Sequence, residues 1–210
     1  MSGYVLHDFP RASSAYRVRI ALALKGIEYT AKPVDFRQDE QSSEAYLAVN
    51  AAGLVPVLET PEGNVITQSL AIIGYLDRLD GPRLYPEKPV DRAIVDAMAL
   101  TVACDIHPLN NLRILKYLEH ELMCDEGCRK RWYAQWVTRG FVALEALVQA
   151  HGGRFCFGDE VSAADICLVP QIYNARRFDV SLEQFPALIV RDDRLRSHAA
   201  FDAVHPERPV

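Results

Sequence analysis

The sequence lacks several features that mark large classes of proteins. Its 210 residues contain no apolar run near the roughly 18 that a membrane-spanning helix needs. The opening stretch does not resemble a secretory signal peptide, because no basic segment leads into an apolar one. Lys and Arg number 23 against 28 Asp and Glu, a net charge of −5, which leaves no overall basic surface for nucleic acid or anionic lipid. We therefore expect a cytoplasmic protein with neither nucleic acid nor membrane as a partner.

Cysteine is scarce and its spacing is uninformative. There are five, an odd number that fits reduced thiols in a cytosol. Cys124 and Cys128 could share one helical face, with His107 or His120 nearby. The spacing lacks both a Cys-x-x-Cys pair and a second pair of ligands, so we expect no metal site.

What is present is ordinary globular composition, half hydrophobic and 24% charged. One stretch differs, Gly81–Pro89, which holds three prolines. Neither a helix nor a central strand continues through such a stretch. The sequence therefore predicts two domains, residues 1–81 and 91–210, joined by a linker at 82–90.

Strand and helix patterns alternate before the linker. The expected strands are Tyr4–Leu6 and Tyr29–Val34, followed by a hairpin of Val55–Leu58 and Val65–Thr67. The expected helices are Ser13–Lys25, with Gly26 as a left-handed stop, then Ser43–Val49 and Ser69–Leu79. This order predicts a small mixed sheet with helices packed against it, an α/β domain.

Strand signals fade after the linker. Asp91–Cys104 and Pro108–Glu121 predict one long or kinked helix, bent at Pro108. Glu126–His151 is strongly periodic, and the Ser-x-x-Asp pattern that begins at Ser162 is typical of a capped helix start. The second domain is therefore expected to be all-helical.

Three short segments of the first domain are candidates for chemistry. Ser13 and Ser14 open a helix among several arginines, so they either cap that helix or help to bind an anion. Pro56 is either a plain edge-strand proline or a cis proline that turns the N–H and C=O of Val55 outward to a peptide ligand. The pair that starts at Gln68 either caps the next helix or binds a carboxylate.

Taken in order with three motifs of the second domain, these segments resemble the zeta class of the glutathione transferase family, the group of maleylacetoacetate and maleylpyruvate isomerases. The resembling stretches begin at Arg11 (RASSAYRVRIAL), Leu54 (LVPVL), Gln68 (QSLAIIGYL), Asp105 (DIHPLNNLR), Gly158 (GDEVSAAD) and Leu168 (LVPQIYNARRF). They extend over nearly the whole chain.

The resemblance implies a thioredoxin-like domain that binds glutathione as cofactor, followed by an all-α domain, in a homodimer. The family's usual Ser-Ser-Cys is Ala12, Ser13 and Ser14 here, which assigns thiolate stabilisation to Ser14, with Ser13 as the alternative. The glutathione-binding positions that the resemblance implies are Ser13, Ser14, Ala15, Tyr16, Arg17, Gln41, Val55, Pro56, Gln68, Ser69, His107, Asn111, Leu112 and Arg113. The candidates for binding the substrate's carboxylates are Arg11, Arg177 and, less strongly, Arg176.

The activity implied by the resemblance is isomerisation of maleylacetoacetate to fumarylacetoacetate in aromatic amino acid (tyrosine) degradation. A thiolate adds to the conjugated double bond, the resulting single bond rotates, and elimination regenerates glutathione. Three alternatives stay open: maleylpyruvate as the substrate, glutathione transfer or dehalogenation of small α-halo acids, and a non-catalytic binding module.

Overall fold

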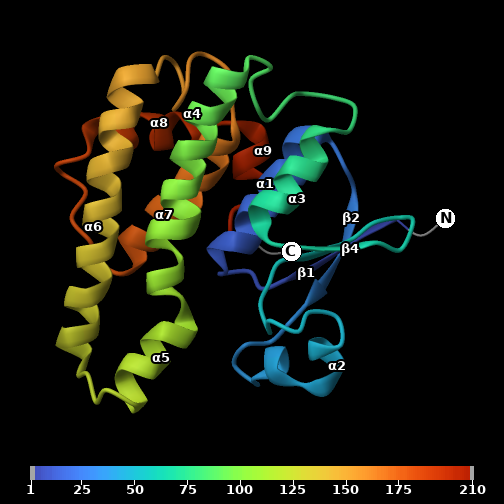
Figure 1. Ribbon diagram of the computed structural model, residues 1–210, viewed down its shortest axis with the longest axis vertical. Coiled ribbons are helices and arrows are strands. Elements are labelled where there is room, and N and C mark those ends of the chain that lie inside the picture. The colour runs from blue at the N-terminus through green and yellow to red at the C-terminus, as the bar shows by residue number, and fades with distance from the viewer. Residues whose placement is uncertain (1–2, 209–210) are drawn as a thin grey trace. The chain divides into compact units, whose positions relative to one another are not determined.

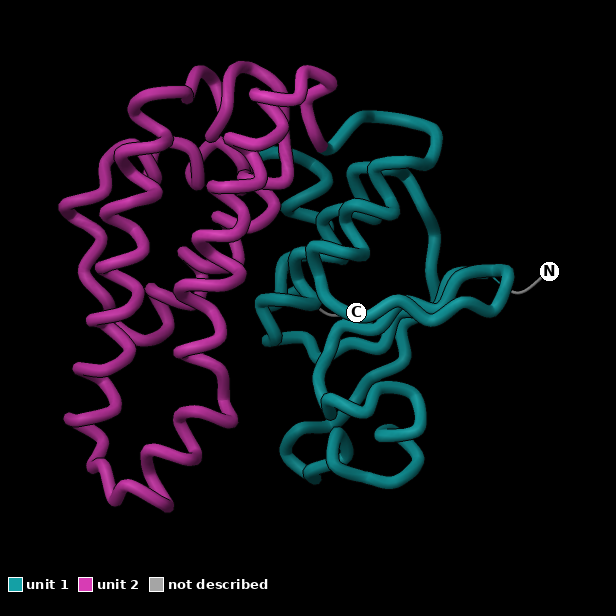
Figure 2. Tube along the Cα trace, in the orientation of Figure 1, with its two compact units in different colours: residues 1–84, 198–210 teal, residues 85–197 magenta. Residues whose placement is uncertain are grey.

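The computed structural model describes residues 3–208, which form two compact units (Figure 2). The first unit runs to Leu84 and also takes in the chain from His198 on; the second is Tyr85–Ser197. The sequence-based division placed the whole C-terminal segment in the second domain. The segment joins the first unit because the short helix α9 (Ala199–Asp202) packs against α1 (Ser13–Lys25).

The first unit is built on a four-stranded mixed sheet in the order β2-β1-β3-β4. The strands are β1 (Tyr4–Asp8), β2 (Tyr29–Pro33), β3 (Val57–Glu59) and β4 (Val65–Thr67). β1 runs parallel to β2 and antiparallel to β3, with Leu6 opposite Leu58, and β3 and β4 form the predicted hairpin. The predicted thioredoxin-like α/β fold is thereby confirmed.

Helices cover both faces of this sheet (Figure 1). On one side α1 packs beside α3 (Ser69–Asp77), and on the other lie the 3₁₀ turn η1 (Glu40–Ser42) and the short helix α2 (Glu44–Leu47). α1 begins and ends where the sequence predicts. Its stop is Gly26, at a φ of 64°, whose N–H returns to carbonyls of the last turn.

The second unit is helical, as predicted. Its α-helices are α4 (Pro89–Leu100), α5 (Leu112–His120), α6 (Glu126–His151), α7 (Ala163–Arg177) and α8 (Pro186–Arg196). The capping box at the start of α7 is formed by Ser162 and Asp165, both buried. No helix within residues 3–208 is long and apolar enough to cross a membrane.

The first helical segment of this unit differs from the prediction. α4 ends at Leu100 instead of Cys104, and the chain continues as a π-helical stretch, η2 (Thr101–Ile106), and a 3₁₀ turn, η3 (Pro108–Asn110). Pro108 has no N–H to continue the helical ladder, which accounts for the bend at this point.

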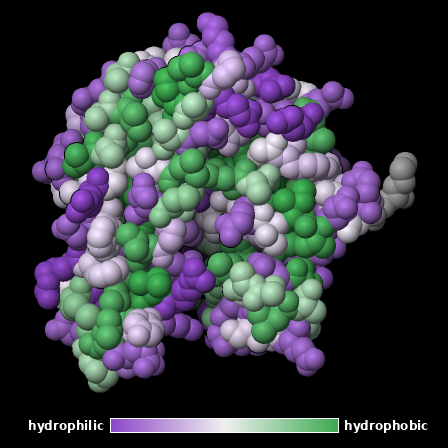
Figure 3. All heavy atoms as spheres, viewed as in Figure 1, coloured by the Kyte–Doolittle hydropathy of each residue, from purple (hydrophilic) through white to green (hydrophobic). Residues whose placement is uncertain are grey.

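The side chain of Ile106 also packs directly on Gly140 of α6, where an added Cβ would lie 2.2 Å from it. Figure 3 shows hydrophobic residues at the surface around the turn from α5 to α6, where Leu122 and Met123 are exposed.

Candidate functional site

The start of α1 has no side-chain cap. Ala12 occupies the N-cap position, where its methyl group cannot accept a hydrogen bond. Ser13 is buried, and the half-buried Ser14 donates a 2.9 Å hydrogen bond from Oγ to the carbonyl of Val55. The first-turn amides therefore keep the partial positive charge that favours an anion.

The loop before β3 is held in place by two hydrogen bonds to one of its carbonyl groups. The carbonyl of Leu54 accepts hydrogen bonds from the hydroxyl of Tyr46 (2.8 Å) and from Nδ2 of Asn50 (2.7 Å). Burial is the main reason that the pKa of Tyr46 is raised to about 12, so this hydroxyl stays protonated and keeps donating at neutral pH.

The peptide bond between Val55 and Pro56 is cis, so the second of the two interpretations of Pro56 is confirmed. The carbonyl of Val55 accepts the Ser14 hydrogen bond, and its availability to a peptide ligand stays a prediction. The N–H of Val55 makes no hydrogen bond within residues 3–208. Val55 thus offers one free backbone donor and one carbonyl that accepts from Ser14 and can accept a second hydrogen bond.

The start of α3 lies against α1 through a buried guanidinium. Arg17, only 1% exposed, donates from Nη1 to Oγ of Ser69 at 3.3 Å. Gln68 precedes Ser69 with a φ of 68°; its side chain is exposed and makes no capping hydrogen bond in the described chain. A cation, a hydroxyl and uncapped amides therefore meet at one helix start.

Gln41 lies in η1, on the other side of the Val55 loop. Its Nε2 donates to Asp39 at 2.5 Å, and its backbone carbonyl approaches Gly53 so closely that a Cβ there would be 3.0 Å away. Gly53 has a φ of 61°. η1 thereby packs on the turn that leads into Val55.

Sequence reasoning missed the residues that fix the loop between β1 and α1. The guanidinium of Arg19 contacts both carboxylate oxygens of Asp8, at 2.7 and 2.6 Å, and donates to the carbonyl of Pro10 at 2.8 Å. Arg19 and Asp8 are both buried. The only signal in the sequence was a second arginine, two residues after Arg17, on a helix that is otherwise largely apolar. Arg11, on the same loop, is exposed and pairs with no other described residue.

The predicted site residues of the second unit lie where the helical stretch is interrupted between η2 and α5. His107 ends η2, and Asn111 caps α5 by accepting from the N–H of Arg113 at 3.1 Å. Leu112 and Arg113 are exposed. The structure places these four residues together at the start of α5.

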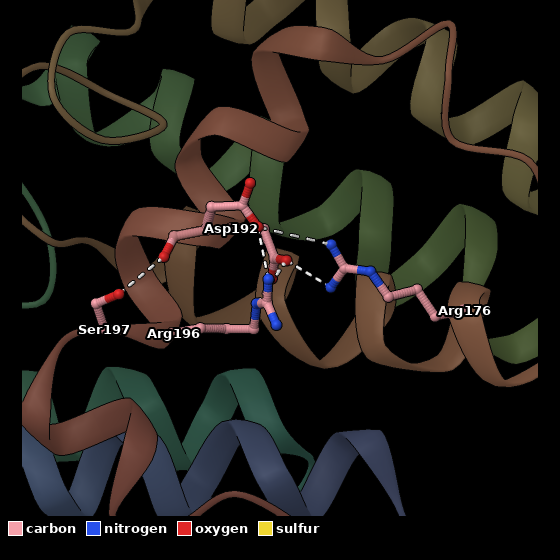
Figure 4. A network of polar contacts seen from close by, with 5 residues as sticks. Arg176, Asp192, Arg196 and Ser197 are labelled. Carbon is pink, nitrogen blue, oxygen red and sulfur yellow. Dashed lines mark hydrogen bonds and ion pairs between the residues drawn. The ribbon is translucent and has the colours of Figure 1, made fainter.

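The two neighbouring arginines at the end of α7 have different surroundings. Arg176 pairs with Asp192 of α8 at 2.6 Å, and Arg196 pairs with the same carboxylate at 3.2 Å (Figure 4). Asp192 is fully buried, and burial raises its pKa against the opposing effect of Arg176. Arg176, whose side chain is 38% exposed, therefore neutralises a buried carboxylate in this structure, and its assignment to the substrate stays a prediction. Arg177 is exposed.

The chemistry that these groups allow is anion and thiolate binding. Uncapped amides, two serine hydroxyls and a buried guanidinium are groups that can stabilise negative charge in the first unit. Among residues 3–208, no group of three or more His, Cys, Asp or Glu side chains is placed to hold a metal ion.

Comparisons with known proteins agree with this fold. The family described as "Glutathione S-transferase, N-terminal domain" matches residues 13–79. A "Probable maleylacetoacetate isomerase" of Vibrio cholerae is 42% identical over 210 residues, covering 99% of this chain and 97% of that protein.

Two solved structures are similar over nearly their whole length. One, a maleylpyruvate isomerase described as a bacterial zeta-class glutathione S-transferase in its holo form, is 39% identical, with a TM-score of 0.93 and 96% of each chain covered. The other, maleylacetoacetate isomerase of Methylobacterium extorquens with bound malonate and glutathione, is 33% identical, with a TM-score of 0.95 and 98% of each chain covered. The chain belongs to the zeta class of the glutathione S-transferase family.

Proposed function

We propose that this protein is a glutathione-dependent isomerase that converts maleylacetoacetate to fumarylacetoacetate. The observation that carries the proposal is the grouping, within the first unit, of the uncapped start of α1, the free N–H of Val55 and the Arg17–Ser69 contact at the start of α3. A family relative of similar fold, crystallised with glutathione and a small dicarboxylate, supports the same chemistry.

The first-unit residues fit an extended, anionic tripeptide. The hydroxyl of Ser69 and the exposed amide of Gln68, beside the buried Arg17, would hold a carboxylate at the start of α3. The backbone of Val55 would pair with a peptide unit as an edge strand does. In the second unit, we assign His107 and Asn111–Arg113 to further contacts with the same cofactor.

Bound glutathione would supply a thiolate that adds reversibly to the conjugated double bond and is released unchanged. A thiol with a pKa near 8.5 is mostly protonated at neutral pH, so the protein must favour the anion. The amides at the start of α1 provide part of that stabilisation. Ser13 and Ser14 provide hydroxyl donors at the same helix end.

Ser14 has two competing uses for its one O–H. In this structure the O–H donates to Val55, but that carbonyl is also the acceptor that a peptide ligand along Val55 would use. The carbonyl can accept from a ligand N–H through its second lone pair, but Ser14 must turn its O–H away from Val55 before it can donate to sulfur. Ser14 is our first choice for the thiolate donor, and Ser13 the second.

The substrate carries two carboxylates, whereas the chain has a net charge of −5. Local arginines must therefore bind it. We assign this role to Arg11 and Arg177, which are both exposed, because a guanidinium matches the geometry of a carboxylate.

Maleylpyruvate is the second candidate substrate, favoured by the 39% identical maleylpyruvate isomerase of TM-score 0.93. We also propose that the protein is a homodimer and that it works in the cytosol, a reducing compartment that fits its five free cysteines.

The test is an assay with both acids side by side, preceded by calorimetric titration with glutathione. The proposal predicts saturable glutathione binding and glutathione-dependent loss of the maleyl absorbance, faster with maleylacetoacetate. A faster reaction with maleylpyruvate would make maleylpyruvate the preferred substrate. Glutathione binding without turnover of either acid would favour a non-catalytic module, and turnover of α-halo acids alone would favour the transferase.

A further inference from the structure

Two cysteines at the turn between α5 and α6 are held with their sulfur atoms in contact. Cys124 lies in the turn, and Cys128 lies in the first turn of α6. Their Sγ atoms are 2.6 Å apart and share a hydrogen bond. Even two carbon atoms rest at about 3.5–4.0 Å, and sulfur is larger, so the pair is closer than ordinary packing requires.

Backbone contacts fix both cysteines. The N–H of Cys124 donates to the carbonyl of Leu118 at 2.8 Å, and the N–H of Cys128 donates to the capping carboxylate of Asp125 at 2.6 Å. Arg129 donates to the carbonyl of Cys124 at 2.9 Å. The backbone of the turn thus holds the two cysteines near each other, and the side-chain rotamers of this structure bring their sulfurs into contact.

The other cysteines lack such an arrangement. Cys156 and Cys167 are fully buried, which makes thiols inert, whereas Cys104 is exposed. Cys124 and Cys128 are half-buried, so a small reagent has access to them.

We propose that Cys124 and Cys128 form a reversible intramolecular disulfide, with a low-molecular-weight disulfide such as oxidised glutathione as the oxidant. The Cys128 thiolate attacks one sulfur of the oxidant, and one glutathione leaves and takes up the proton that Cys128 lost. Cys124 then loses its proton, attacks the Cys128 sulfur and releases the second glutathione, which takes up that proton. The dithiol is oxidised by two electrons and the oxidant is reduced to two thiols.

The surroundings of Cys124 decide which sulfur attacks first. Cys124 lies in the turn before α6, and Cys128 lies in the first turn of that helix. The hydrogen bond with Cys128 and burial raise the pKa of Cys124, which makes Cys124 the resolving thiol.

The experiment uses the full chain, reduced, freed of reductant and treated with oxidised glutathione, then alkylated and digested. Trypsin releases Tyr117–Arg129, a peptide that holds both cysteines. We expect this peptide to be unalkylated and lighter by two hydrogens, to remain joined after cleavage at Glu126, and to revert with dithiothreitol. Because the partner thiol is tethered, half-oxidation should require at least about tenfold less oxidant than half-modification of Cys104.

Matched variants separate the steps. In the Cys124→Ser variant, the reaction should stop at a mixed disulfide between Cys128 and glutathione. The Cys104→Ser variant should still form the Cys124–Cys128 disulfide. The wild-type digest alone overturns the proposal if Cys124 and Cys128 remain alkylatable, or carry separate glutathiones, at concentrations that modify Cys104. This test is independent of the proposed isomerase activity, since it measures no turnover.

Discussion

The hydroxyl of Ser14 donates to the carbonyl of Val55 across 2.9 Å, joining the start of α1 to the residue before a cis proline. A single hydroxyl thereby links the two elements proposed to hold the reacting thiol and its peptide backbone. Because a hydroxyl has one proton to donate, Ser14 must give up its hydrogen bond to Val55 in order to donate to a thiolate.

Ser14→Ala should raise the pKa of bound glutathione and lower kcat by about 10- to 100-fold, because one donor to the thiolate is lost. The pKa is measured by titrating the thiolate absorbance of the complex, and kcat in the isomerase assay. The change should lower the free energy of unfolding by only about 0.5–1.5 kcal/mol, the usual contribution of one hydrogen bond.

Ser13→Ala is the matched control for that variant. It should change the pKa of bound glutathione less than Ser14→Ala does. The reverse order would assign the thiolate to Ser13, and no change in either variant would leave the main-chain amides of α1 as the sole source of stabilisation.

The two donors to the Leu54 carbonyl should support glutathione binding indirectly. Tyr46→Phe removes one donor and should lower the free energy of unfolding by about 1 kcal/mol. The double variant Tyr46→Phe/Asn50→Ala leaves the Leu54 carbonyl with neither donor. In this variant the Kd for glutathione should rise several-fold more than the product of the increases in the two single variants. Calorimetry checks this, and strictly additive changes would show that the loop holds its shape without these bonds.

The neighbouring arginines of α7 should behave differently when each is replaced by alanine. Arg177→Ala should raise KM for the diacid more than KM for glutathione and leave thermal stability nearly unchanged. Arg176→Ala weakens the neutralisation of the buried Asp192 carboxylate and should lower the free energy of unfolding by about 1–3 kcal/mol. Equal effects of Arg177→Ala on both KM values would remove Arg177 from the substrate site.

The fold was predictable from the sequence where local signals were strong, as at α1 with its glycine stop and at α7 with its capping box. Pro108 predicts that the long helix is interrupted near this residue. The π-helical turn before Pro108 was not predictable, because it packs Ile106 against Gly140 of a helix far away in the sequence. No local pattern distinguishes Arg176 from Arg177. The two arginines differ because Arg176 pairs with Asp192, which tertiary packing alone brings close to the end of α7.

The buried pair of Arg19 and Asp8 should be the costliest polar contact to break in the first unit. Replacing one partner, as in Arg19→Leu, leaves a buried charge unpaired and should cost about 3–5 kcal/mol in urea unfolding. Adding Asp8→Asn to that variant should recover part of the loss. A double variant as unstable as the sum of the single variants would show that the two side chains act independently.

The central claim is that glutathione acts as a cofactor and is not consumed. The most direct measurement supplies a large molar excess of maleylacetoacetate over glutathione and follows product and total free thiol together. We expect fumarylacetoacetate to accumulate far beyond the amount of glutathione while the free thiol concentration stays constant. Product that stops at one equivalent of glutathione, with a matching loss of thiol, would contradict the claim and identify a transferase.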